Sequence, residues 1–155
     1  MKFRFITPVL LILFPYLMIV PFITGISLEF GVRYFPVILV GLLASLFLNV
    51  LNVFTCQMGA AELARWNLVI KLALIPFHCI IALLGFGFMP AIPILFVLTY
   101  SLLLASSCYG IRGLMLAREE PLWNPKLFWR LMIPHFFLIA DVIAAIIFHN
   151  ECKTL

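Results

Sequence analysis

The residues that could do chemistry in this chain are a few polar side chains set inside apolar stretches. In ELARWNLVIKLALIPFHCIIALLG, residues 62–85, the polar side chains of Asn67, Lys71 and His78 follow the spacing i, i+4 and i+11. These positions share one face of a helix, so the three side chains form a polar stripe. Ionisable groups inside a membrane helix are energetically costly, and they usually face protein or water and pair with one another.

Other apolar stretches supply polar groups at matching depths. Asp141 is the only acidic residue deep inside a predicted span, about 16 Å from the cytoplasmic end of that span at 1.5 Å per residue. An isolated carboxylate there becomes protonated or finds a partner, and His78, about 18 Å in, is the depth-matched candidate. Lys71, about 7 Å in, either extends to the headgroups or bonds to a neighbouring helix. The predicted polar cluster also includes Asn49, Asn52, Ser106, Ser107 and His135, of which the histidine is expected at the interface.

The stretches that position these side chains are long enough to cross a membrane. The chain has 155 residues, 66% hydrophobic and 10% charged, with a mean hydropathy of +1.24. A soluble domain needs more polar surface than this, so the bilayer is the solvent. Five apolar segments predict five transmembrane helices in a single domain, residues 1–155, because a backbone in hydrocarbon must satisfy its own hydrogen bonds. The predicted spans are residues 5–26, 34–55, 66–87, 91–111 and 129–148.

We therefore expect an all-α helical bundle, with four spans as the alternative if one segment is re-entrant or interfacial. The positive charges predict its orientation. With the N-terminus in the cytoplasm, seven basic residues lie inside and two lie outside. The inside group is Lys2, Arg4, Arg65, Arg112, Arg118, Lys126 and Arg130, and the outside group is Arg33 and Lys153. This orientation puts the C-terminus outside.

Small residues at helical spacing predict close helix packing. One ridge carries Gly41 and Ser45, a second carries Ser101 and Ala105, and a third carries Gly110 and Gly113. Such ridges let helices approach closely. Packing within the chain and packing between copies both fit this pattern.

Motifs of common enzymes and cofactor sites are missing from the sequence. It contains no H-E-x-x-H, no G-x-S-x-G and no Walker loop, and its four cysteines form no C-x-x-C pair. Its ten Lys and Arg residues form no run or stripe that would suit nucleic acid. We therefore expect no catalytic residue, no metal and no cofactor, and the lipid bilayer as a partner.

Two stretches resemble a family of small, mostly uncharacterised multi-pass membrane proteins of Gram-positive bacteria. The first stretch has the pattern Trp-Asn-x-x-x-Lys-x-x-x-x-Pro, at Trp66, Asn67, Lys71 and Pro76. The second has the pattern Tyr-Gly-x-x-Gly-Leu, at Tyr109, Gly110, Gly113 and Leu114. The resemblance covers roughly the central third of the chain. It implies a membrane protein and brings no established activity.

Two main hypotheses about function follow. The first is an assembly or accessory component that packs laterally against itself, as a homo-oligomer, or against a larger membrane protein. The small-residue ridges and the missing catalytic motifs favour it. The alternative is a small ion channel or proton-linked transporter, in which the stripe of Asn67, Lys71 and His78 lines a polar path and Asp141 exchanges a proton with His78. An intramembrane enzyme ranks third.

Overall fold

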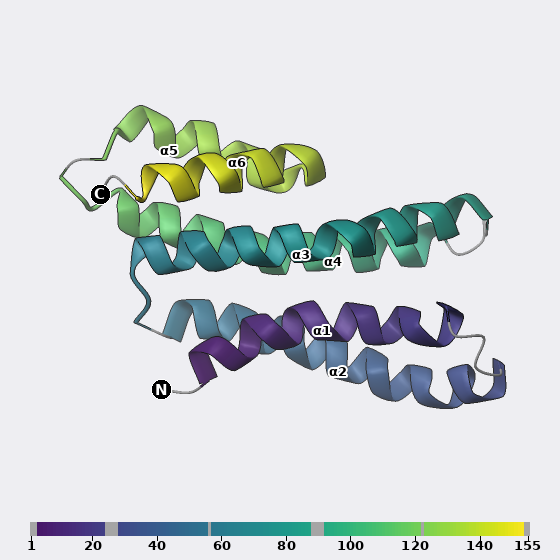
Figure 1. Ribbon diagram of the computed structural model, residues 1–155. Helices are drawn as coiled ribbons and strands as arrows, with labels where there is room; N and C mark the ends of the chain where they lie inside the picture. Colours follow the sequence, from purple (N-terminus) through teal and green to yellow (C-terminus); the bar gives the residue numbers. More distant parts are fainter. Residues whose placement is uncertain (1–2, 24–27, 56, 88–91, 122, 154–155) are drawn as a thin grey trace. The chain divides into compact units, whose positions relative to one another are not determined.

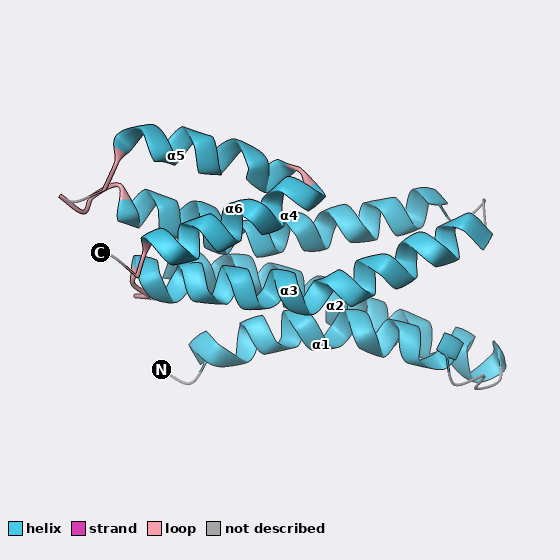
Figure 2. Cartoon of the chain, turned by 45° about the horizontal axis from the view of Figure 1, so that its top comes forward, coloured by secondary structure: helices cyan, strands magenta, loops and turns pink. Residues whose placement is uncertain are grey.

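The computed structural model describes residues 3–23, 28–55, 57–87, 92–121 and 123–153. These residues form helices joined by turns, and no strand occurs among them (Figure 2). Within this described part, three stretches are long and apolar enough to cross a membrane: Pro36–Thr55, Ala60–Leu84 and Leu95–Ala117. A shorter apolar helix covers Phe5–Val20. The all-α prediction is confirmed, and the three long apolar helices are consistent with a membrane protein.

The chain divides into two compact units, Met1–Asn52 and Val53–Leu155. Helices α1 (Phe3–Ile23) and α2 (Leu28–Thr55) begin the chain. The buried Asn49 side chain donates a hydrogen bond from Nδ2 to the carbonyl of Thr7, at 2.7 Å, and so joins α2 to α1. A side chain at Gly41 would overlap the ring of Phe14. The ridge that carries Gly41 and Asn49 therefore packs within the first unit.

The second unit is built on two long helices, α3 (Ala60–Gly87) and α4 (Ile92–Ala117), which lie side by side (Figure 1). Both helices are rich in apolar residues. Their backbone N–H and C=O groups bond to each other within each helix, as an environment without water requires. Three shorter elements follow: α5 (Pro125–Met132), the 3-10 helix η2 (Ile133–Phe136) and α6 (Leu138–Glu151). They pack against α3 and α4.

The fifth predicted span, residues 129–148, is not one continuous helix. Helix α5 starts where the Asn124 side chain accepts a hydrogen bond from the Lys126 amide at 3.0 Å, with Pro125 in the first turn. Pro134 lacks an amide hydrogen and lies in the 3-10 turn that follows α5. Phe137 then has an extended backbone, with φ −121° and ψ 122°. The chain turns at this point, and α6 runs back beside α5 (Figure 1).

A buried cluster shows that α6 ends where α5 began. The cluster joins the start of α3, the end of α4 and both ends of the α5–α6 hairpin. Its members are Ala64, Leu114, Ala117, Trp123, Phe128, Leu131, Ala144, Phe148 and Cys152. The rings of Trp123 and Phe148 meet edge to face, with centroids 6.0 Å apart. The first and last residues of the hairpin therefore lie at the same end of the second unit.

The count of five spanning helices is not confirmed, because residues 129–148 form a hairpin and not one long helix. The hairpin tip contacts Ser107, which lies about 15 Å along α4 from Ala117 at a rise of 1.5 Å per residue. That is about half of the roughly 30 Å hydrocarbon layer. Residues 24–26 of the first predicted span, residue 91 of the fourth, and Lys2 lie outside the described residues.

Candidate functional site

A cluster of charged side chains lies where the hairpin tip meets α3. The Lys71 ammonium of α3 forms an ion pair with Oδ1 of Asp141, in the first turn of α6. The same oxygen lies 2.5 Å from Nδ1 of His135, in η2. Lys71 is 4% exposed, and His135 and Asp141 are fully buried. Buried charges of this kind are tolerated when they are paired and hydrogen-bonded, and here each charge has its counter-charge.

The position of one proton decides how the cluster is bonded. Lys71 Nζ also lies 3.0 Å from Nδ1 of His135. An ammonium only donates and a carboxylate only accepts, so Nδ1 faces one donor and one acceptor. With a hydrogen on Nδ1, His135 donates to Asp141, and without it His135 accepts from Lys71. The neutral imidazole of His135 can therefore carry its hydrogen on Nδ1 or on Nε2, and each tautomer gives the cluster a different set of bonds.

Ser107 connects α4 to the tip of the hairpin. Its hydroxyl donates to the backbone carbonyl of His135 at 2.9 Å, and it lies 3.4 Å from both carboxylate oxygens of Asp141. Its neighbour Ser106 instead donates to the carbonyl of Leu103, within α4, at 2.9 Å. Of the two adjacent serines, Ser107 belongs to the charged cluster, and its hydroxyl holds the 3-10 turn against α4.

Gly110 lets the imidazole of His135 and the amide of Asn67 approach the backbone of α4. A Cβ at this position would lie 2.5 Å from Nε2 of His135 and 2.8 Å from Nδ2 of Asn67. Nε2 and both polar atoms of the Asn67 amide are buried and have no hydrogen-bond partner among the described residues. A Cβ at Gly113 would lie 2.8 Å from the ring of Phe148. Both glycines of the third small-residue ridge are therefore used for packing within the chain.

The expected partner of Asp141 is wrong. Asp141 is bonded to Lys71 and His135, whereas Nδ1 of His78 donates to the carbonyl of Leu74 at 2.6 Å. Lys71 does not extend to the headgroups, because it is buried in an ion pair. His135 is fully buried at the hairpin tip, and its place at the membrane interface stays a prediction. The wrong partner for Asp141 comes from treating residues 129–148 as one straight helix, whereas they contain a 3-10 turn and an extended residue.

The remaining predicted residues lie outside this cluster. Ser45 and Asn49 bond within the first unit, where the Ser45 hydroxyl donates to the carbonyl of Leu42 at 2.8 Å. Asn52 is buried and ends that unit. On α4, Ser101 donates to the carbonyl of Val97 at 2.7 Å and Ala105 is buried.

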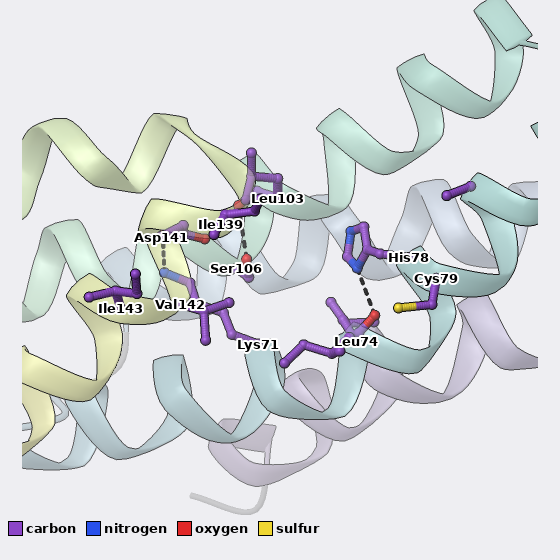
Figure 3. Close-up of a pocket in the computed structure, with 12 residues that line it drawn as sticks. Lys71, Leu74, His78, Cys79, Leu103, Ser106, Ile139, Asp141, Val142 and Ile143 are labelled. Carbon is purple, nitrogen blue, oxygen red and sulfur yellow. Dashed lines mark hydrogen bonds and ion pairs between the residues drawn. The ribbon is translucent and has the colours of Figure 1, made fainter.

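A pocket of about 460 Å³ lies beyond the hairpin tip, where α3 and α4 continue and α6 does not (Figure 3). Its walls come from one face of α3, from α4 and from the start of α6. The lining residues are Lys71, Leu74, Ile75, His78, Cys79, Ala82, Leu103, Ser106, Ile139, Asp141, Val142 and Ile143. Most of the lining is apolar. Lys71 and Asp141 meet at one end, and His78 lies further along α3 (Figure 3). The pocket therefore has mostly apolar walls and a few hydrogen-bonding groups.

No group of three metal-binding side chains occurs in the part of the chain that the structure describes. Comparison with protein-family models, curated proteins and solved structures gives no match. The resemblance seen at Trp66–Pro76 and Tyr109–Leu114 therefore stays a prediction that rests on its two motifs.

Proposed function

We propose that this chain is a multi-pass protein of the bacterial cytoplasmic membrane that acts through lateral contacts, as an assembly or accessory component. The observation that favours this proposal over a conducting path is the buried ion pair between Lys71 and Asp141. The two charges neutralise each other, at most 4% of either residue is exposed, and together they fasten the hairpin to α3. Such a pair is best explained as a clamp between helices.

A conducting path would need different surroundings. Ions and protons cross membranes along cavities lined by polar groups that water can reach. Here most of the lining surface of the pocket next to the ion pair is apolar. The alternative, a proton-linked transporter, has one specific observation in its favour: Nδ1 of His135 lies within bonding distance of both Lys71 and Asp141. The two functions are therefore tested against each other.

We propose a topology of four spans and a re-entrant hairpin, in place of five spans. The hairpin enters and leaves at the cytoplasmic end, so the C-terminus is cytoplasmic. With Lys153 on the cytoplasmic side, eight basic residues lie on that side of the membrane and one lies outside, so the bias of positive charge toward the cytoplasm is stronger. The exposed side chains of Lys126, Trp129 and Arg130 on α5 suit a headgroup region, where basic residues and tryptophan are enriched.

The experiment compares flux with lateral association for the same proteins. Purified wild-type chain, Asp141→Asn and the control Ser101→Ala are reconstituted in liposomes that carry a pH-sensitive dye. In parallel, each protein is cross-linked in native membranes and its partners are identified. We expect proton flux no greater than in empty liposomes, together with a defined complex. Flux that Asp141→Asn abolishes and Ser101→Ala preserves would overturn the proposal in favour of the transporter.

A further inference from the structure

We propose that the pocket beyond the hairpin tip binds an uncharged glycerolipid that carries a free hydroxyl, of the diacylglycerol type. The site is separate from the lateral contacts of the proposed function, and either can fail without the other. Lys71 and Asp141 at one end and His78 further along α3 are the groups that would recognise the ligand.

The shape and surface of the pocket favour a ligand that arrives from the bilayer. Its volume of about 460 Å³ lies within the range of about 300–1,000 Å³ that is typical of small-molecule sites. Ile139 on its α6 wall is 80% exposed, and Ile75 and Ile143 are exposed as well. In a membrane such side chains face acyl chains, so the pocket opens toward lipid and suits an apolar tail.

The polar groups of the pocket favour a hydroxyl and a carbonyl. Nδ1 of His78 already donates to the carbonyl of Leu74, which leaves the lone pair of Nε2 as an acceptor. Nε2 has no partner among the described residues, so a ligand hydroxyl could donate to it. Lys71 has three N–H donors and two neighbours within bonding distance, Asp141 and His135. Its third N–H could donate to an ester carbonyl.

The charge balance of the pocket favours an uncharged headgroup. Lys71 and Asp141 line the pocket as a neutralised pair. A phosphate or free carboxylate in this apolar site would be an additional charge without a counter-charge, and burying such a charge is strongly unfavourable. A glycerol ester offers a hydroxyl donor and carbonyl acceptors without charge.

The test uses photoreactive lipids with the full chain in nanodiscs. The probe is a diacylglycerol with a diazirine in one acyl chain. It is compared with the same lipid acetylated at its hydroxyl and with phosphatidic acid of the same chains. We expect the diacylglycerol to label peptides within Leu74–Ala82 and Leu138–Ile143. Acetylation should reduce labelling about fivefold, the loss expected for one hydrogen bond.

Two variants and one control locate the effect. His78→Phe keeps an aromatic ring but removes the acceptor, and it should reduce labelling about fivefold. Ile139→Trp places a larger side chain at the exposed wall and should block labelling. Phe96→Trp, at another exposed position outside the pocket, should leave labelling unchanged. The proposal is overturned if the acetylated lipid or phosphatidic acid labels as well as diacylglycerol, if His78→Phe has no effect, or if the pocket peptides cross-link to a second copy of the chain instead.

Discussion

Replacement of Asp141 by asparagine should leave Lys71 as an unpaired charge in the interior of the second unit. The amide has nearly the shape of the carboxylate, so packing around Ser107 and His135 is largely kept while the counter-charge is lost. Removing one partner of a buried ion pair typically costs about 3–5 kcal/mol of unfolding free energy. Because Lys71 is 4% exposed and Asp141 is fully buried, we expect a loss in that range.

A double-mutant cycle separates the ion pair from other effects of substitution. Lys71→Met removes the charge and keeps most of the apolar stem, so the double variant Lys71→Met/Asp141→Asn contains no unpaired charge. It should be more stable than Asp141→Asn alone. Hydrogen-bonded pairs in membrane proteins couple by about 0.6 kcal/mol on average and about 1.7 at most. The coupling for this charged pair should exceed the upper value.

The assay is unfolding of the purified protein by SDS in mixed micelles, followed by far-UV circular dichroism. Ser101→Ala is the control, because its hydroxyl bonds only within α4 and is exposed. It should change the unfolding free energy by less than about 0.5 kcal/mol. A coupling energy between Lys71 and Asp141 within about 0.5 kcal/mol of zero would mean that the two sites are independent, and it would refute the clamp.

Two further substitutions test the packing. Gly110→Ala should destabilise the second unit by about 1–3 kcal/mol, because the added methyl group would overlap Nε2 of His135. The control Gly59→Ala has nothing within 4 Å of its added Cβ and should leave the unfolding free energy unchanged. Equal unfolding curves for both variants would contradict the close approach of His135 to α4. Asn49→Leu should destabilise by about 0.6–1.7 kcal/mol through loss of the bond to the Thr7 carbonyl. The same SDS titration measures it, and an unchanged midpoint would show that this bond does not hold α2 to α1.

The helical class and the long helices follow from the sequence because they depend on composition. Stretches of about 20 apolar residues satisfy their backbone groups only as helices in hydrocarbon. The predicted spans at 34–55, 66–87 and 91–111 accordingly fall within α2, α3 and α4, apart from residue 91, which is not described. Part of the charged cluster could also be predicted, since buried ionisable groups in apolar stretches must find partners. Lys71, His135, Asp141 and Ser107 meet in it, whereas Asn49, Ser106 and His78 bond elsewhere.

The pairing within the cluster depends on tertiary structure, so it could not be predicted from the sequence. On a straight helix, His135 and Asp141 are six residues apart and point about 120° away from each other, so they cannot converge on one partner. The break at Phe137 reverses the chain and brings Nδ1 of His135 to Oδ1 of Asp141, the oxygen that Lys71 also binds. Pro134 was the one local signal. Proline in a membrane helix more often bends the helix than ends it, so it does not predict a hairpin.

The re-entrant hairpin is tested most directly by thiol labelling from the two sides of the membrane. In a background without native cysteines, Glu119→Cys places a thiol on the exposed turn before α5, and Lys153→Cys places one on the exposed turn after α6. A membrane-impermeant maleimide is added to inverted vesicles and to right-side-out vesicles. A hairpin that enters and leaves at one end predicts that both thiols react in the same preparation, the inverted one. Reaction of Glu119→Cys in one preparation and of Lys153→Cys only in the other would mean that residues 129–148 cross the membrane, and it would contradict this account.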